Sequence, residues 1–407
     1  MVQLGYVDKR TLVKYQKQAA QLSIAPSAAT PTSLLSWIMD EDDSERERGV
    51  TMDIATKQME LEKHEICILD APGHEDFLPR LFTGVASADV ALLVVDVMDV
   101  KEIVIQQHVL LSRGLGVLQL LVAVNKMDNL NWQQAKFKAV RQQLLPLLQR
   151  NGFRNTLFIP VSGKTGENVM SVGKDCPAWV REMNTSLLQG MNAWTPVSRQ
   201  YDKPLRIVVK DVYTESNHNS KGLVVAGRVV QGVVQVGQEL RVAGLPSDQL
   251  VRTHRIGEEG KNMASAGDTV PLGLTLLAPM VLKPGHVLSH NDVWRPPCAK
   301  RVLAQILLLP NLSTILIKGS RVVWHMHCME TPAVVSKLLP GKNQKRPPRA
   351  LSNPSNSTNT NSRVEISFDE PVCIEPYQEC RALGRFVLRR GADTLAVGLV
   401  EKILVEA

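Results

Sequence analysis

Long hydrophobic runs are missing from this chain of 407 residues. No apolar stretch approaches the roughly 20 residues that a membrane helix requires. The opening, MVQLGYVDKR, also lacks the hydrophobic segment of a secretory signal. We therefore expect neither membrane insertion nor export.

Paired cysteines are lacking as well. The sequence has 6 cysteines with no CxxC pair, no regular spacing and no accompanying histidine cluster. This pattern indicates neither a disulfide framework nor a zinc site, and it favours a reducing, cytoplasmic setting. The net charge of +7 is compatible with an anionic partner such as RNA, although many solvated surfaces are equally basic.

Short apolar runs alternate with amphipathic stretches up to about residue 195. The runs EICILD, ADVALLVVD, LQLLVAVNKMD and LFIPVSG each have the character of a buried strand, and helical patterns follow or separate them. This alternation predicts a parallel sheet covered by helices, over residues 1–195.

The remainder is rich in Val, Gly and Pro and predicts two antiparallel β-barrels, over residues 203–292 and 298–407. Pro296 and Pro297 mark the seam between them. A low-complexity insertion, residues 340–363, interrupts the last barrel and cannot bury enough apolar surface to order itself. It is either a flexible hairpin loop or a basic contact to RNA or a protein.

Polar motifs follow three of the predicted strands. The first is DxxG: Asp70 can hold magnesium through water, Gly73 lets a backbone N–H approach a phosphate, and His74 can orient an attacking water. A loop histidine with no ligand role is the alternative for His74, because an isolated DxxG occurs by chance.

The second motif, NKxD, combines three side chains. Asp128 can accept hydrogen bonds from N1–H and the exocyclic amino group of guanine, Asn125 can brace the loop, and the Lys126 stem can cover the base. The third motif is Ser162-Gly163-Lys164, whose backbone N–H groups can bind the guanine carbonyl. Each alone could be a polar turn, but carboxyl ends of parallel strands meet at one edge, so we expect the three loops to act together.

A fourth motif precedes these three. In ERERGVTMD, the Thr51 hydroxyl can complete the coordination shell of a magnesium ion that bridges two phosphates. The acidic and basic run before it can equally be a solvated surface.

Together these stretches resemble the translational GTPases of the elongation factor 1-alpha and eukaryotic release factor group. The resemblance rests on ERERGVTMD, LDAPGHEDF, SADVALLVVD, VAVNKMDNLNWQQ and LGRFVLRRGADTLAVGLV. NKMDNLNWQQ and RGVTMD look most like the Hbs-type ribosome-rescue factor, the partner of Pelota in no-go decay.

The resemblance implies a P-loop-type GTPase domain and two antiparallel β-barrels, with GTP or GDP and Mg²⁺ as ligands. It further implies hydrolysis of GTP in ribosome rescue, in the cytoplasm, with RNA contacted through the ribosome. Thr51 and Asp70 would bind the metal ion, and His74 would be the catalytic residue. The guanine nucleotide would be bound by Asp70, Gly73, Asn125, Lys126, Asp128, Ser162, Gly163 and Lys164.

One hallmark of such GTPases, the phosphate loop G-x-x-x-x-G-K-[ST], does not occur in the sequence. The trio Gly163-Lys164-Thr165 has Phe158, not glycine, five positions before it. The opening LGYVDKRTLVKYQKQ resembles the segment that follows the phosphate loop and its helix, so the first strand also falls outside the chain. That strand lies mid-sheet in the family, and its absence would leave two unpaired strand edges.

Three functions remain open from the sequence. The first is a GTP-hydrolysing rescue factor whose given sequence lacks its N-terminus. The second is a non-hydrolysing binding module that acts through its β-barrels. The third is an elongation factor that delivers aminoacyl-tRNA.

Overall fold

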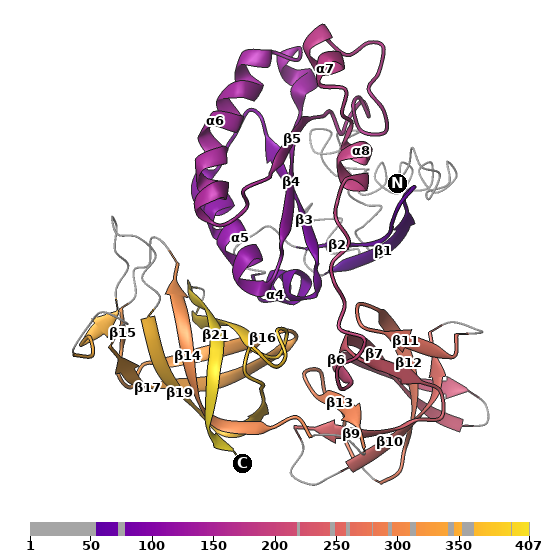
Figure 1. Ribbon diagram of the computed structural model, residues 1–407, viewed down its shortest axis with the longest axis vertical. Helices are drawn as coiled ribbons and strands as arrows, with labels where there is room; N and C mark the ends of the chain where they lie inside the picture. Colours follow the sequence, from indigo (N-terminus) through magenta and orange to yellow (C-terminus); the bar gives the residue numbers. More distant parts are fainter. Residues whose placement is uncertain are drawn as a thin grey trace, which may run out of the picture. The chain divides into compact units, whose positions relative to one another are not determined.

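The computed structural model divides into two compact units, Met1–Pro196 and Val197–Ala407. Figure 1 shows the elements of each unit. The structure describes residues 54–71, 78–217, 220–244, 249–257, 261–278, 280–291, 295–309, 315–340, 346–351, 362–391 and 393–406.

A parallel three-stranded sheet is the centre of the first unit. Its order is β3-β4-β5, with β3 at Val90–Asp96, β4 at Gln119–Asn125 and β5 at Leu157–Pro160. The central strand, QLLVAVN, is buried over Leu120–Val124 because it carries apolar side chains on both faces. The predicted parallel sheet is confirmed for these three strands.

Helices cover both faces of this sheet. Leu120, Val122 and Val124 face a core shared with α5 and α6, whereas Leu121 and Ala123 face Met191 of α8 (Figure 1). The bounds are α4 Leu78–Ser87, α5 Glu102–Leu115, α6 Gln134–Arg150, α7 Ala178–Met183, α8 Leu187–Asn192 and the 3-10 helix η2 Met127–Leu130.

The segment from Ala178 to Asn192 forms two short helices and not one. Asn184 takes a left-handed conformation that ends α7, and Ser186 then caps α8 in a reciprocal capping box with Gln189. The polar stretch between the two apolar patterns therefore breaks the helix, since Ser at the N-cap satisfies the first free N–H groups of a new one.

The prediction of a buried parallel strand is wrong for EICILD. This segment is β2, Glu65–Asp70, and it pairs antiparallel with β1, Ala55–Glu60, as a separate two-stranded sheet. Among the described residues, β2 is not hydrogen-bonded to β3. Ile66 and Ile68 pack against the same core as Met191, so alternate positions of β2 are partly buried.

The second unit holds two closed antiparallel barrels, as predicted. The first has the order β10-β12-β7-β6-β13-β9, with a small β8–β11 ladder beside it. Its strands are β6 Arg206–Asn217, β7 Ser220–Gln231, β8 Val233–Gln235, β9 Glu239–Ala243, β10 Gln249–Ile256, β11 Met263–Ser265, β12 Thr269–Leu276 and β13 Val287–His290.

The second barrel has the order β14-β19-β17-β16-β20-β21. Trp324 stacks on Phe386 in its core, with ring centroids 3.6 Å apart. Its strands are β14 Cys298–Leu308, β15 Leu316–Ile317, β16 Arg321–Met326, β17 Met329–Leu339, β18 Ala350–Leu351, β19 Ser362–Cys373, β20 Arg385–Arg390 and β21 Asp393–Glu406.

The low-complexity insertion is partly ordered, contrary to expectation. Ala350 and Leu351 form β18, which pairs with β15, and Leu351 is buried in the core of the second barrel. One apolar side chain among polar neighbours is enough to anchor this point. Residues 341–345 and 352–361 of the insertion lie outside the described residues.

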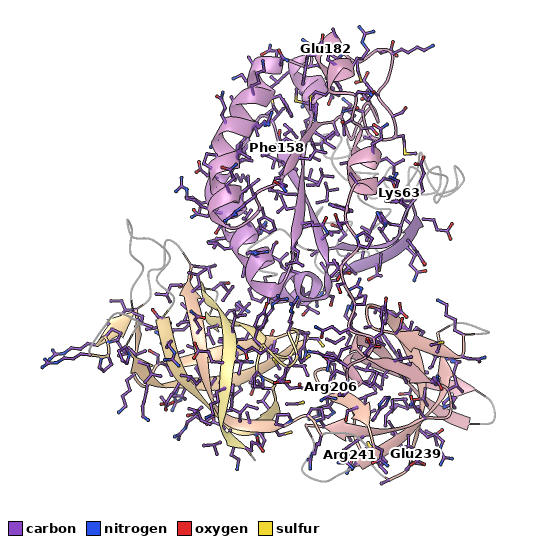
Figure 2. All side chains as sticks on the ribbon, viewed as in Figure 1. Lys63, Phe158, Glu182, Arg206, Glu239 and Arg241 are labelled. Atoms are coloured by element: carbon purple, nitrogen blue, oxygen red, sulfur yellow. The ribbon has the colours of Figure 1, made fainter. Side chains whose placement is uncertain are left out.

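A buried ion pair joins the two barrels. The Arg206 Nε of β6 donates to Glu375 Oε1 across 2.6 Å, and both side chains are 1% exposed. Arg206 lies at the start of the first barrel (Figure 2). An apolar cluster surrounds the contact and is contributed by both barrels: Val208, Ala243, Val287, Cys373, Cys380 and Leu383.

None of the helices in the described part of the chain is both long and apolar enough to cross a lipid bilayer.

Candidate nucleotide-binding site

The ends of β3, β4 and β5 bring polar residues to one edge of the sheet. Asp96, the last residue of β3, lies opposite Asn125, the last residue of β4, in the parallel register. Ser162 and Gly163 follow β5 by two and three residues. The common edge arises because parallel strands all end on the same side, which is where open α/β sheets bind ligands.

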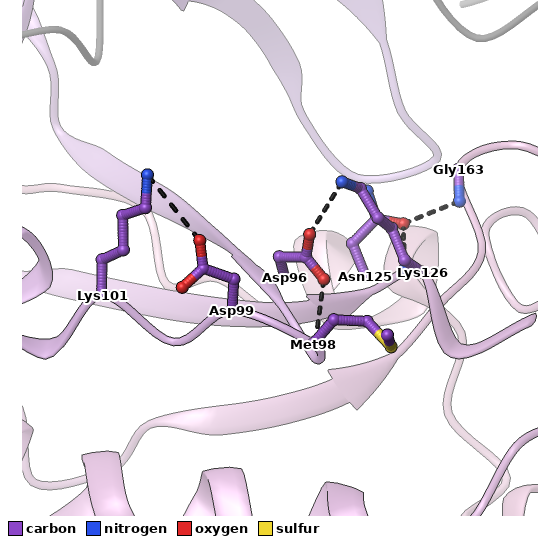
Figure 3. Close-up of polar contacts among 7 residues, drawn as sticks. All are labelled: Asp96, Met98, Asp99, Lys101, Asn125, Lys126 and Gly163. Carbon is purple, nitrogen blue, oxygen red and sulfur yellow. Dashed lines mark hydrogen bonds and ion pairs between the residues drawn. The ribbon is translucent and has the colours of Figure 1, made fainter. Parts of the chain in front are cut away.

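Asn125 links two of the predicted motifs. Its Oδ1 accepts hydrogen bonds from the backbone N–H of Lys126 at 2.8 Å and of Gly163 at 2.9 Å (Figure 3). The first bond braces its own loop and the second joins that loop to the turn after β5. The structure therefore brings Asn125, Lys126 and Gly163 together, as the spacing of the motifs predicts.

Gly163 must approach Asn125 closely to make this bond. A Cβ at position 163 would lie 3.4 Å from both the Nδ2 and the Oδ1 of Asn125. This is an ordinary contact distance, so the space beside Asn125 does not by itself require glycine at position 163.

Lys126 contacts a residue that the sequence analysis did not select. Its backbone is left-handed, at φ 64°, and its Nζ lies 2.7 Å from Asp96 Oδ2. Burial alone would raise the pKa of Asp96, but the hydrogen bonds from Lys126 and from the Met98 N–H outweigh it and lower that pKa. Asp96 is therefore an ionised carboxylate at this edge, with the exposed Asp99–Lys101 pair nearby (Figure 3).

Asp128 presents a carboxylate oxygen that has no hydrogen-bond donor among the residues that the structure describes. The residue lies in η2, its side chain is half-buried, and Oδ1 is buried without a hydrogen-bond donor. A buried acceptor with no partner is costly unless a bound group donates to it. The position fits a ligand that carries N–H donors.

Ser162 is fully buried and shapes the turn that carries Gly163 and Lys164. Its N–H donates to Glu167 O at 3.2 Å, its carbonyl accepts from Gly166 N–H at 2.8 Å, and its Oγ accepts from Thr165 N–H at 3.2 Å. The turn leaves Gly163 and Lys164 exposed. These two residues therefore face solvent at the same edge as Asn125.

Asp70 ends β2 and pairs with Ala55 in the two-stranded sheet, not in the sheet of Asn125. Thr51, Gly73 and His74 lie outside the described residues. Within the described ranges, no three His, Cys, Asp or Glu side chains converge as a metal site.

Three residues of the site were missed from the sequence: Asp96, Trp132 and Glu167. Asp96 could have been found, because it ends an apolar strand as Asp70 and Asn125 do. The other two form a contact between loops, with the Trp132 Nε1 donating to Glu167 Oε2 at 3.2 Å. No sequence pattern predicts that pairing across 35 residues of chain.

The fold and this polar edge define a GTP-binding domain followed by two β-barrels, the architecture of a translation factor. Residues 1–210 match the family model of the elongation factor Tu GTP binding domain, and residues 301–401 match the GTP-eEF1A C-terminal domain-like model. The chain belongs to the translational GTPase family.

Relatives agree with this assignment along nearly the whole chain. Elongation factor 1-alpha of Thermoplasma acidophilum is 32% identical over 401 residues, which are 97% of this chain and 91% of that protein. Protein HBS1 of Drosophila melanogaster is 32% identical over 415 residues, 98% of this chain and 59% of HBS1. The family resemblance drawn from the motifs is thus confirmed.

Solved structures share the fold. The GTPase-like domain of S. cerevisiae Ski7, bound to GDP and inorganic phosphate, superposes with a TM-score of 0.76 at 15% identity, over 98% of this chain and 92% of that one. The elongation factor SelB of Methanococcus maripaludis has a TM-score of 0.65 at 22% identity, over 87% of this chain and 74% of that one.

Proposed function

We propose that this protein is a GTP-binding translation factor that hydrolyses GTP in ribosome rescue, in the cytoplasm, together with a Pelota-type release-factor-like partner. The observation that carries the nucleotide part is the unsatisfied Asp128 Oδ1 beside the Asn125–Gly163 link. The family supports the translational part, and the HBS1 relative supports the rescue role.

Guanine recognition follows from the donor pattern of the site. The Asp128 carboxylate would accept from N1–H and the exocyclic amino group of the base, which adenine does not offer together. The Gly163 N–H already donates to Asn125 Oδ1, so the N–H of the exposed Lys164 would donate to the guanine carbonyl. Asn125 would hold both loops in place without contacting the base.

We assign magnesium and catalysis to the segments around β2. Thr51 and Asp70 would hold Mg²⁺ through their oxygens, directly or through water, because hard cations bind oxygen ligands. Gly73 would admit a backbone N–H to the terminal phosphate. His74 would orient the attacking water, as a positioned polar side chain does in such reactions.

The nucleotide assignment is tested by exchanging the acceptor for an amide. Asp128→Asn should weaken GDP binding by roughly two orders of magnitude, since two charge-assisted hydrogen bonds are lost. Xanthosine diphosphate should bind better than to the wild type, because the amide can donate to its extra carbonyl. Competition of each nucleotide against a fluorescent GDP analogue measures both, and an unchanged preference for GDP would remove Asp128 from the base pocket.

The catalytic assignment is tested on ribosomes. His74→Ala should leave guanine nucleotide affinity within about twofold but reduce ribosome-stimulated hydrolysis about 100-fold or more, as for a group that acts in the transition state. An equal loss of both would indicate a structural histidine. No ribosome-stimulated hydrolysis by the wild type, despite binding of the partner, would favour the non-hydrolysing binding module.

Delivery of aminoacyl-tRNA is the second candidate, because elongation factor 1-alpha and HBS1 are equally similar to this chain at 32% identity. The full chain should bind a Pelota-type protein and not charged tRNA. We assign the partner contact to the barrel that carries Arg385, whose guanidinium lies 5.1 Å from the Tyr377 ring. Arg385→Glu should weaken that binding, and preferential capture of charged tRNA would reverse the assignment.

A further inference from the structure

Trp132 has an unusual backbone for a bulky side chain. It follows η2 at φ 55°, and the preceding Asn131 is also left-handed at φ 45°. Residues other than glycine rarely adopt this left-handed backbone conformation, and a large residue does so only where surrounding contacts hold it. Such positions cluster at functional sites, where surrounding contacts hold the backbone in place.

Three hydrogen bonds fix Trp132, and each reaches a different segment. Its backbone N–H donates to Met127 O at 3.0 Å, which closes the loop that contains Asp128. Its carbonyl accepts from the Trp179 Nε1 of α7 at 3.0 Å. Its own Nε1 donates to Glu167 Oε2 at 3.2 Å.

Glu167 carries the contact into the turn after β5. The same Oε2 accepts from the Thr165 hydroxyl at 3.1 Å, and the Glu167 carbonyl accepts from the Ser162 N–H at 3.2 Å. Glu167 therefore bonds Ser162 and Thr165, the residues on either side of the exposed pair Gly163 and Lys164. The Trp132–Glu167 bond is a further bridge between the two loops, in addition to Asn125–Gly163 and to the bond from the Met127 N–H to Val161 O at 3.3 Å.

We propose that Trp132 is a positioning residue of the guanine pocket, which holds the Ser162–Gly163 turn, through Glu167, at the distance from Asp128 that the base requires. The inference rests on the proposed guanine site. One loop carries the acceptor for the base amino group, and the other carries the donors for its carbonyl. The bonds at Asn125 and Met127 join the loops close to the strand ends, and the bridge at Trp132 holds them together further along each loop.

Base selectivity is the property that this bridge controls. Inosine diphosphate lacks the exocyclic amino group, so it loses one of the two bonds to Asp128 but keeps the rest of the nucleotide. If the loops shift, both nucleotides lose part of the bonds to the carbonyl and N1–H, and GDP loses the bond to the amino group as well, so GDP is weakened more than inosine diphosphate. A general loosening of the domain would weaken both nucleotides equally.

The test uses the full chain and competition of GDP and inosine diphosphate against a fluorescent GDP analogue. Trp132→Phe keeps an aromatic ring, smaller than the indole, but removes the N–H, and it should weaken GDP about tenfold and inosine diphosphate about twofold. Glu167→Ala should do the same. Glu167→Gln keeps an acceptor oxygen and should stay within about twofold of the wild type. Trp194→Phe, which packs in the core around Met191, is the matched tryptophan control.

Equal weakening of the two nucleotides by Trp132→Phe, or no change, would overturn the inference while leaving the guanine site intact. A wild-type protein without preference for GDP over inosine diphosphate would contradict the proposed function itself. A measurement without nucleotide tests the bridge independently of the proposed guanine site. The amide resonance of Gly163 should shift in Glu167→Ala and not in Glu167→Gln, and an unchanged resonance in both would refute the bridge.

Discussion

Two ion pairs of nearly equal length have opposite surroundings. Lys126 Nζ and Asp96 Oδ2 are 2.7 Å apart at the strand-end edge, with side chains 55% and 27% exposed. Arg206 and Glu375 are 2.6 Å apart between the barrels, with both 1% exposed. Water screens the Lys126–Asp96 pair, so losing it should change the stability of the fold little. At the Arg206–Glu375 pair no solvent can replace a missing partner. The site can rearrange its charges for a ligand, and the barrel junction cannot.

The junction has further contacts that resist rearrangement. Arg206 also donates to Leu205 O at 2.7 Å, and the Cys328 Sγ of the second barrel donates to Val209 O of the first at 3.1 Å. Lys203 Nζ reaches Glu379 O at 3.0 Å. The bonds of Cys328 and Lys203 cross between the barrels, as the ion pair does, so we expect the two barrels to unfold together.

The largest effect should come from Arg206→Ala. Removing the guanidinium leaves the buried Glu375 carboxylate unpaired, which should cost about 3–5 kcal/mol of unfolding free energy. Denaturant unfolding at pH 7 measures it. The matched control is Arg252→Ala, which breaks an exposed 2.6 Å pair with Glu239 and should cost less than about 1 kcal/mol.

The pH dependence of Arg206→Ala sharpens the same contrast. Burial raises the pKa of Glu375 even though Arg206 opposes the shift. A carboxyl group whose folded pKa is raised favours the folded state at low pH and loses that contribution as the pH rises through the folded pKa. The cost of the substitution should therefore shrink on acidification. An equal cost at pH 5 and pH 8 would contradict the role of the unpaired charge.

A smaller loss is expected inside the second barrel. A Cβ at position 398 would overlap the Phe386 ring, which itself stacks on Trp324. Gly398→Ala should thus lower the unfolding free energy by about 1–3 kcal/mol through overpacking. Gly173→Ala meets only ordinary contacts, the nearest at 3.6 Å from Cys176 Sγ, and should change stability little.

Lys126→Ala should be nearly silent for stability. Its ion pair with Asp96 is mostly exposed, so the unfolding free energy of the first unit should change by less than about 1 kcal/mol. The pKa of Asp96 should rise, because the ammonium that lowers it is gone. A loss comparable to that of Arg206→Ala would break the contrast between the two ion pairs.

The junction between the barrels also contains the Cys298 thiol, for which we predict an order of chemical labelling and no change in stability. Cys298 lies opposite Cys373 in the β14–β19 register, and the hydrogen bond from the Cys373 thiol lowers the pKa of Cys298 to about 6. Burial raises the pKa of Cys380 to about 11. Alkylation at pH 7 should therefore modify Cys298 before Cys380, and the rate at Cys298 should level off as the pH rises above about 6. Faster labelling of Cys380, read by mass spectrometry, would contradict this order.

Sequence patterns predicted the folded core better than its edges. The runs that became β3, β4 and β5 were found because each is a continuous apolar run, although Leu92 and Val94 of β3 are exposed in the structure. The barrels were found because short strands and turns recur. β2 was misplaced in the parallel sheet because alternation in EICILD does not reveal which strand it pairs with. The domain boundaries given in the sequence analysis stay predictions.

Some residues of the candidate site could likewise be predicted from the sequence, and others could not. Asn125 and Gly163 were selected because each follows an apolar strand, and the structure joins them. The roles of the site residues in binding stay predictions. Trp132 and Glu167 could not be found, since their contact depends on a left-handed backbone that no pattern marks. The Arg206–Glu375 pair joins residues 169 positions apart, beyond the reach of local periodicity.

The central claim is that the strand-end loops recognise guanine while the barrel junction maintains the fold. The most direct measurement is GDP affinity and unfolding free energy of one variant, Asn125→Ala, beside the control Asn151→Ala, which loses only a bond to Leu147 O. Asn125→Ala removes both loop bonds at Oδ1, so GDP should bind about 30-fold more weakly while the unfolding free energy falls by no more than about 2 kcal/mol. Unchanged GDP affinity together with a large loss of stability would contradict the account.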